Sequence, residues 1–411
     1  MARRTVEYAC AVVVIGLLAG AAGAATTLLL HAVEHLVYHY SFGSLLTGIG
    51  GSTPMRRAVG PMVGGALAGL GWWILRRRDD VPSLSATIAA HRPIPRWRMS
   101  IDAGLQVLVV GSGASLGREG APRQFSAALG DLGTSRWSIT ARDREILLAC
   151  AAGAGLGAVY GVPLGGAVFA VRILLGTWHP RAVGTALVTS SLAVAVSSPV
   201  THLERSLVWP DPSLSYLFVI LACAIAPLAV VVGFAFDKLM TWVRPRPQIR
   251  SWMLVPAIAV AGLATGICSI WWPELPGNGR SILTVSLNSS LSLGGAAVIL
   301  VLKPMLTALY LRTGAVGGLI TPALATGAAA GTVFTLAVNQ LFGADFQVAA
   351  VSLACAAGVL AITQRAPLFA ALFVWELARP PVWLFVVFAA AAFTAHGIRL
   401  LRERKRSDTV A

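Results

Sequence analysis

The segment GREGAPRQ, residues 117–124, places an arginine and a glutamate between glycines in a chain that is 56% hydrophobic and only 12% charged. Pro122 suits the first turn of a helix, so the residues before it lie where a helix presents unpaired N–H groups and the positive end of its dipole. Glycine lets a bare anion approach these groups, because no side chain intervenes. The segment therefore predicts a site for an anion.

Glu119 is an acid within an otherwise apolar region. An ionisable side chain at the centre of a membrane helix costs on the order of 3 kcal/mol, so its default interpretation is functional. Its carboxylate competes with an anion for the same N–H groups and can be displaced or protonated, which predicts a gate. The alternative is an ion pair with Arg118 in a solvated loop.

A second segment, GAVGGLITP at residues 314–322, also places glycines ahead of a proline. Two such helix starts, brought together, would form a cradle for an anion. Neutral dipoles let the anion leave again, which a salt bridge would hinder.

The segment HAVEHLVYH, residues 31–39, contains the H-x-x-E-H pattern of inverted zinc peptidases. Helical spacing places His31, His35 and His39 on one face. They lie at the end of the first apolar run, where amphipathic residues anchor a helix at the membrane interface. We therefore predict no metal site and no cofactor, and a membrane-embedded metallohydrolase remains the alternative from another class.

Long stretches without charge recur along the chain, whose mean hydropathy is +0.75. Crossing a membrane takes about 20 apolar residues as a helix, and the alternation of an outer-membrane barrel is absent. The sequence predicts an all-α, multi-pass membrane protein that is not an enzyme. The uncharged stretches cover residues 8–33, 58–75, 182–203, 212–236, 251–273, 281–302, 313–344 and 346–364.

The net charge of +15 is concentrated in particular loops, whereas residues 39–55 carry no charge. This asymmetry places both termini in the cytoplasm of a protein of the plasma membrane. A nucleic-acid partner is not expected, because no soluble basic domain would carry it. The basic residues gather at Arg3 and Arg4; at Arg76, Arg77, Arg78, Arg92, Arg96 and Arg98; at Lys238, Arg244, Arg246 and Arg250; and in the tail RLLRERKR.

Several motifs occur twice, about 200 residues apart. LACAAG stands at 148–153 and 353–358, and GVPLGG and RAPLFA share prolines at 163 and 367. This predicts two homologous halves, residues 1–211 and residues 212–411, the second with a short basic cytoplasmic tail. Residues 76–98 carry six arginines and their counterpart, 277–300, only one, so the halves should have inverted topology.

These motifs resemble those of the CLC family of chloride channels and proton-coupled chloride exchangers. GREGAPRQ is similar to the family's GREGP motif, GAVGGLITP to GGxFxP, LPGNGRSIL (275–283) to the GNG segment, and the proline segments to paired APL motifs. The resemblance implies short, tilted and broken helices, a homodimer in the lipid bilayer, and a chloride or other small-anion pore in each subunit. It makes Glu119 the gating glutamate and implies anion coordination at Gly117, Arg118, Glu119, Gly120, Gly318, Leu319, Ile320 and Thr321.

The sequence departs from the family pattern on the inner side of the pore. Asp79 aligns with the serine of the central anion site, Ile173 with the internal proton-transfer glutamate, and the central tyrosine has no counterpart. Neighbouring Arg172 stays protonated and cannot shuttle a proton. We therefore expect channel-like or weakly proton-coupled transport, with Asp79 at the central anion site. A proton-coupled chloride antiporter and a structural homologue that no longer transports are the alternatives.

Overall fold

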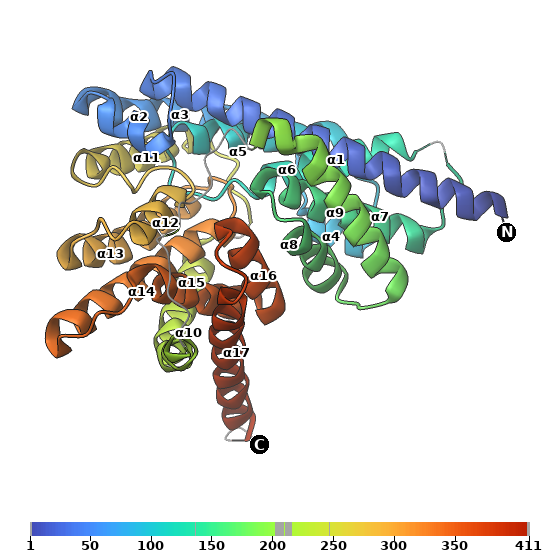
Figure 1. Cartoon of the computed structure of the whole chain (residues 1–411). Helices are drawn as coiled ribbons and strands as arrows, with labels where there is room; N and C mark the ends of the chain where they lie inside the picture. The colour runs from blue at the N-terminus through green and yellow to red at the C-terminus, as the bar shows by residue number, and fades with distance from the viewer. Residues whose placement is uncertain (1, 136, 202–208, 210–215, 246, 409–411) are drawn as a thin grey trace.

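The computed structural model describes residues 2–135, 137–201, 209, 216–245 and 247–408 (Figure 1). Within these residues the regular secondary structure is helical, apart from one isolated two-residue bridge, and loops connect the helices. The helices are α1 (Ala2–Tyr38), α2 (Leu45–Gly51), α3 (Pro54–Arg76), α4 (Leu84–Ala89), α5 (Arg96–Gly111), α6 (Gly120–Gly133), α7 (Ala141–Tyr160), α8 (Pro163–Val168), the π-helix η1 (Phe169–Leu175), α9 (Pro180–Thr201), α10 (Leu217–Val243), α11 (Leu254–Trp271), α12 (Arg280–Leu287), α13 (Leu293–Arg312), α14 (Ile320–Phe342), α15 (Val348–Gln364), α16 (Pro367–Ala378) and α17 (Leu384–Asp408).

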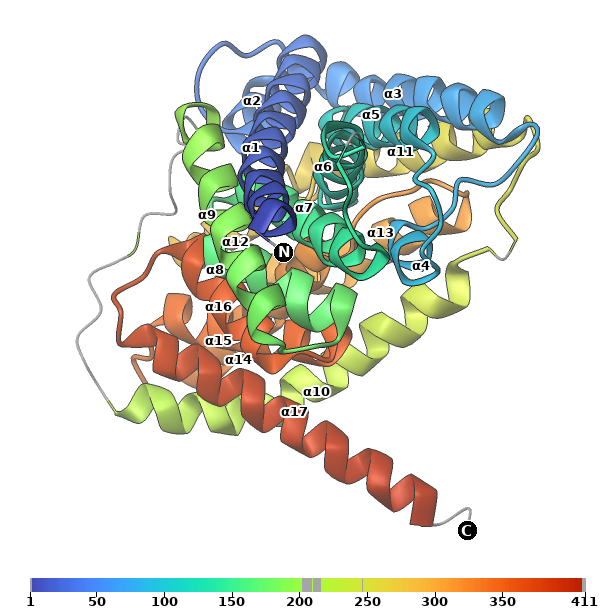
Figure 2. The ribbon, with the colours of Figure 1, turned by 90° about the vertical axis from the view of Figure 1, so that its right-hand side faces the viewer.

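Eight of the described helices are long and apolar enough to cross a membrane, which confirms the predicted all-α, multi-pass architecture. They are α1, α3, α9, α10, α11, α13, α14 and α17. Figure 2 shows α10 and α17 side by side, with α17 projecting beyond the body of the molecule. The predicted basic tail does not form a separate segment: residues 399–408 continue α17.

One uncharged stretch that the sequence presents as continuous is broken in the structure, and another begins with a loop. Residues 281–302 divide into α12 and the start of α13, with a break where the Ser292 hydroxyl accepts a hydrogen bond from the Gly295 N–H at 3.1 Å. Residues 313–319 form a non-helical loop ahead of α14. The prediction of short and broken helices is therefore confirmed. The run 281–302 is not a single span, because α12 ends inside it and Ser292 caps the start of α13, whereas the run 313–344 holds one candidate span, α14.

Small residues let helices from the two halves of the chain approach closely. A Cβ atom on Gly65 of α3 would lie 2.6 Å from the carbonyl oxygen of Ile258 of α11. In return, a Cβ atom on Gly262 of α11 would lie 2.1 Å from the carbonyl oxygen of Pro61 of α3. This is the close backbone packing that small residues allow between membrane helices.

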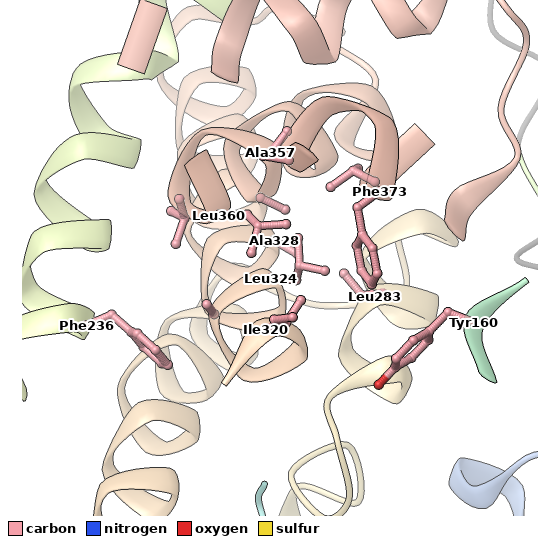
Figure 3. Packing of buried hydrophobic residues seen from close by; sticks show 14 of the residues in the cluster. Tyr160, Phe236, Leu283, Ile320, Leu324, Ala328, Ala357, Leu360 and Phe373 are labelled. Carbon is pink, nitrogen blue, oxygen red and sulfur yellow. The ribbon is translucent and has the colours of Figure 1, made fainter. Parts of the chain in front are cut away.

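The paired motifs occupy corresponding elements. The two LACAAG copies lie in α7 and α15, and the two proline segments open α8 and α16. Both α7 and α15 are buried along most of their length. Figure 3 shows residues of α14 facing Ala357 and Leu360 of α15, with Phe373 and Tyr160 nearby. The predicted boundary between the halves, at residues 211 and 212, lies outside the described residues and remains a prediction.

Candidate anion site

The two glycine-rich segments meet in space. Gly117 and Gly318 form an antiparallel bridge, in which the Gly117 N–H donates to the Gly318 carbonyl at 2.8 Å and the Gly318 N–H donates to the Gly117 carbonyl at 2.7 Å. Directly after these residues the chain enters α6 and α14. The structure therefore brings together two helix N-termini that are about 200 residues apart in sequence.

Glu119 lies at this junction and its side chain is fully buried. Its Oε1 atom accepts hydrogen bonds from the Thr321 N–H at 2.7 Å, from the Thr321 hydroxyl at 2.5 Å and from the Tyr160 hydroxyl at 3.4 Å. Every one of these donors is electrically neutral. The carboxylate therefore sits in the place and with the partners that a small anion would have at the start of α14.

Gly117 and Gly318 lie against the Glu119 carboxylate, and neither position has room for a side chain. A Cβ atom on Gly318 would lie 1.5 Å from Glu119 Oε2, and one on Gly117 would lie 2.0 Å from the same atom. Both distances are shorter than any real carbon–oxygen contact. The carboxylate can occupy this position only because neither neighbour has a side chain.

Glu119 Oε2 has no hydrogen-bond partner among the described residues. An acceptor left unpaired in a buried site costs about 1–3 kcal/mol, and more if it is charged. This position is therefore not an ideal resting place for the carboxylate, which favours a side chain that can leave it.

Arg118 is also buried, at 5% exposure, and its guanidinium lies over the Tyr160 ring, 5.0 Å from the centroid. The alternative of an Arg118–Glu119 pair in a solvated loop is wrong, because both side chains are buried. Gly120, Leu319 and Ile320 lie at the starts of α6 and α14, beside the bridge.

Three polar residues at the site were missed by sequence reasoning. Tyr160, at the end of α7, contacts Glu119 and accepts a 3.5 Å hydrogen bond from Asn278. Lys303 is fully buried in α13, and its ammonium donates to the carbonyls of Leu275 and Gly277. The sequence does contain a signal for Lys303, because this single charge follows directly on the long uncharged run 281–302, and a charge inside a membrane segment indicates a site.

A cavity of about 480 Å³ lies on the other side of the two helix starts. Gly120 and Gly317 line it, so it adjoins both glycine-rich segments. Three arginines and one aspartate also line it: Arg76, Arg123, Arg244 and Asp102. Ile173, the position aligned with the proton-transfer glutamate, lines the same cavity.

The structure does not bring Asp79 to this cavity. Its side chain is 75% exposed and its carboxylate lies 3.5 Å from Arg98. The residues that follow, 81–85, line the cavity instead, and Ser83 caps α4 by accepting from the Ala86 N–H. The alignment that assigns Asp79 to the central anion site is therefore a few residues away from the segment that lines the cavity. The loop ahead of α4 turns Asp79 outward.

The histidine motif does not keep its predicted geometry. His39 lies beyond the end of α1 with φ 51°, so it leaves the face shared by His31 and His35. Glu34 is buried and accepts a hydrogen bond from the Tyr40 hydroxyl at 3.1 Å. Among the described residues, no group of three histidine, cysteine or acidic side chains is arranged to hold a metal.

Comparison with known proteins identifies the class. Residues 64–399 match the family model of the voltage gated chloride channel, so the chain belongs to the voltage-gated chloride channel (CLC) family. This confirms the resemblance seen in the motifs. The protein is a multi-pass membrane member of this family of chloride channels and transporters.

Individual relatives span nearly the whole chain. The voltage-gated ClC-type chloride channel ClcB of Escherichia coli O17:K52:H18 (strain UMN026 / ExPEC) is 27% identical over 373 residues, which is 89% of each protein. ClcB of Escherichia coli strain SMS-3-5 / SECEC is 27% identical over 379 residues, again 89% of each.

Solved structures share the fold. A slow cyanobacterial Cl⁻/H⁺ antiporter has a TM-score of 0.76 at 19% identity, over 98% of this chain and 99% of the other. A CLC-type fluoride/proton antiporter has a TM-score of 0.72 at 20% identity, over 96% of both chains. The low identities mean that these two comparisons speak for the fold alone.

Proposed function

We propose that this protein carries chloride or another small anion across the plasma membrane through a pore in each subunit, and that Glu119 gates the pore. The observation that carries the proposal is the position of the Glu119 carboxylate, which lies at the N-terminus of α14 and between Gly117 and Gly318. Support for chloride comes from the relatives of 27% identity, which are named chloride channels.

The gating step follows from the hydrogen bonds. When the carboxylate leaves, the Thr321 N–H and hydroxyl lose their acceptor, and a small anion can take its place. The anion is held by neutral donors, so it can leave again toward either side. Protonation of Glu119 favours release, because a neutral carboxyl group is a weaker acceptor than a carboxylate.

The transported anion would contact the backbone of both segments. We propose that Gly117, Arg118 and Gly120 on one side, with residues 318–321 on the other, coordinate it through N–H groups at the helix starts. Asp79 is left out of this set, because its side chain is exposed and paired with Arg98.

The mode we propose is channel-like or weakly proton-coupled. A tightly coupled exchanger needs an ionisable group between the inner side and Glu119, and Ile173 cannot carry a proton. The second candidate is a proton-coupled chloride antiporter. Asp102 favours it, because this aspartate is the one acidic residue among those that line the inner cavity. A homologue without transport is the further alternative.

The remaining expectations belong to the same proposal. We propose that the protein is a homodimer, that both termini lie in the cytoplasm, and that residues 1–211 and 212–411 form repeats of inverted topology. The corresponding positions of α7 and α15, and of α8 and α16, support the repeats. Cross-linking in bilayers that yields monomers alone would contradict the dimer.

Chloride efflux tests the proposal. The purified protein is reconstituted in liposomes loaded with chloride, and efflux is followed with a chloride electrode after valinomycin sets the voltage. Wild-type protein should release chloride, and Glu119→Gln and Glu119→Ala should both change the rate. Efflux no faster than from empty liposomes would refute transport, and equal rates in all three proteins would refute gating by Glu119.

A further inference from the structure

The C-terminal end of α15 lies beside the C-terminal parts of α10 and α17. Arg399 of α17 joins the three helices. Its Nη1 donates to the Ile362 carbonyl of α15 at 2.7 Å, and its guanidinium lies 5.8 Å from the centre of the Phe234 ring of α10. From this contact α17 projects beyond the body of the molecule (Figure 2). The three helices therefore meet at the edge of the molecule.

Three further cations surround this meeting point, one from each helix or its end. Arg402 of α17 lies over the same Phe234 ring, with its guanidinium carbon 5.3 Å from the centroid. Lys238 follows Phe234 by one helical turn and lies on the same face of α10. Arg365 directly follows α15 and is close enough to Glu403 of α17 for the two charges to interact. All three cationic side chains are exposed, and we call Lys238, Arg365 and Arg402 together the basic junction.

The acidic side chains nearby do not neutralise these cations. Glu403 accepts a hydrogen bond from the Arg399 Nε at 2.8 Å, so its carboxylate is already paired with a buried arginine. Among the described residues, no member of the basic junction forms an ion pair. Asp237 is exposed and likewise has no ion pair in the part of the chain that the structure describes. Four positive and two negative side chains gather here, so the net charge is positive.

Apolar side chains beside the basic junction face outward. Val231 of α10 and Leu401 of α17 are both exposed, and both helices are candidate membrane spans. Trp242 lies one helical turn beyond Lys238 and is 81% exposed. Tryptophan is enriched at the level of the lipid headgroups. The basic junction therefore lies where a membrane places its headgroups, next to a surface that faces the acyl chains.

We propose that the basic junction binds the phosphate headgroup of an anionic phospholipid, whose acyl chains lie along the exposed apolar faces of α10 and α17. A guanidinium holds a phosphate with two parallel hydrogen bonds, and an ammonium holds it as a point charge. Basic pockets between membrane helices recognise anionic headgroups in this way. A zwitterionic lipid binds more weakly, because its own cation is repelled. The site goes beyond the proposed function, since it does not depend on anion transport.

Lipid binding to the purified protein tests the site. The full chain is prepared in an uncharged maltoside detergent and titrated with dioleoylphosphatidylglycerol or dioleoylphosphatidylcholine, and native mass spectrometry counts the lipids that stay bound. Wild type should bind phosphatidylglycerol at least about fivefold more tightly than phosphatidylcholine. It should also unfold at a higher temperature with phosphatidylglycerol, because a ligand that binds only the folded state stabilises it.

Charge variants locate the binding. Arg402→Gln and Lys238→Gln should each weaken phosphatidylglycerol binding about fivefold, which corresponds to about 1 kcal/mol for each cation. The double variant should weaken it about 25-fold if the two contributions add. Asp237→Asn removes a negative charge beside Lys238 and should strengthen binding. Arg4→Gln is the matched control, because it removes an exposed arginine at the end of another membrane span, α1, and should leave binding unchanged.

Several outcomes would overturn the site. They are equal binding by wild type and the double variant, equal binding of the two lipids, and equal weakening by Arg4→Gln. Inorganic phosphate forms a further arm, and thermal stabilisation by phosphate as large as that by phosphatidylglycerol would show a site for the free ion and not for a lipid. Arg402→Lys keeps the charge and should stay within about threefold of wild type, so it preserves the test if Arg402→Gln does not fold.

Discussion

Replacing Thr321 by valine should loosen the hold on the Glu119 carboxylate. Valine keeps the shape of the side chain and the backbone N–H but removes the hydroxyl that donates to Glu119 Oε1 at 2.5 Å. The backbone N–H at 2.7 Å and the Tyr160 hydroxyl at 3.4 Å remain. The carboxylate should therefore leave its seat more often.

The size of the effect follows from the kind of bond that is lost. A hydrogen bond to a charged group contributes about 1.5–3 kcal/mol. At 1.4 kcal/mol for each factor of ten, the balance between seated and displaced carboxylate shifts roughly 10- to 150-fold. Because the hydroxyl can also serve the passing anion, the effect on the carboxylate must be isolated with a double-mutant cycle.

The assay is chloride efflux from proteoliposomes with wild type, Thr321→Val, Glu119→Ala and the double variant. Thr321→Val should raise the rate about tenfold more with Glu119 present than in the Glu119→Ala background. Thr326→Val is the control, because its hydroxyl bonds to the Pro322 carbonyl within the same helix. Effects that simply multiply across the cycle, or an equal change in Thr326→Val, would refute the reasoning.

Three further predictions concern stability and coupling. Asp102→Ala should lower the free energy of unfolding by about 2–3 kcal/mol, because the buried indole N–H of Trp72 loses its acceptor and the side-chain amides of Gln106 and Gln124 each lose one. Denaturation in detergent measures this, and a loss under about 1 kcal/mol would contradict it. Lys303→Met should lower the free energy of unfolding by about 2–4 kcal/mol in the same assay, because two buried carbonyls lose their donor. Lys303→Arg should lower it less, and equal losses in the two variants would contradict this prediction. A chloride gradient, with voltage clamped by valinomycin and potassium, should drive little or no uphill proton movement, and sustained uphill movement that Glu119→Gln abolishes would show that the inner side holds a proton relay.

The outline of the site could be predicted from the sequence because its chemistry is local. Glycines ahead of Pro122 and Pro322 indicate helix starts, and a buried acid beside one of them indicates a competitor for its N–H groups. The repeat of these patterns about 200 residues apart then predicts that the two starts meet. The Gly117–Gly318 bridge places them together as this reasoning requires.

The rest of the site depends on contacts that no local pattern encodes. Tyr160 reaches Glu119 only because α7 ends beside the bridge, and its position carries no special spacing. Arg76 donates to the Gly314 carbonyl, 238 residues away in sequence, and this contact exists only because the end of α3 packs beside the loop ahead of α14. The motif alignment assigns Asp79 to the central anion site, but its side chain is exposed. Alignment fixes the order of residues along the chain and not the path of a loop.

The measurement that tests the central claim most directly is the anomalous diffraction of bromide in crystals of Glu119→Ala. The claim is that the Glu119 carboxylate occupies an anion position, so an anion should fill that position once the side chain is removed. A bromide peak within hydrogen-bond distance of the Thr321 N–H, present in Glu119→Ala and absent in wild type, is the predicted result. Crystals of Glu119→Ala soaked in bromide that show no peak between Gly117, Gly318 and Thr321 would contradict it.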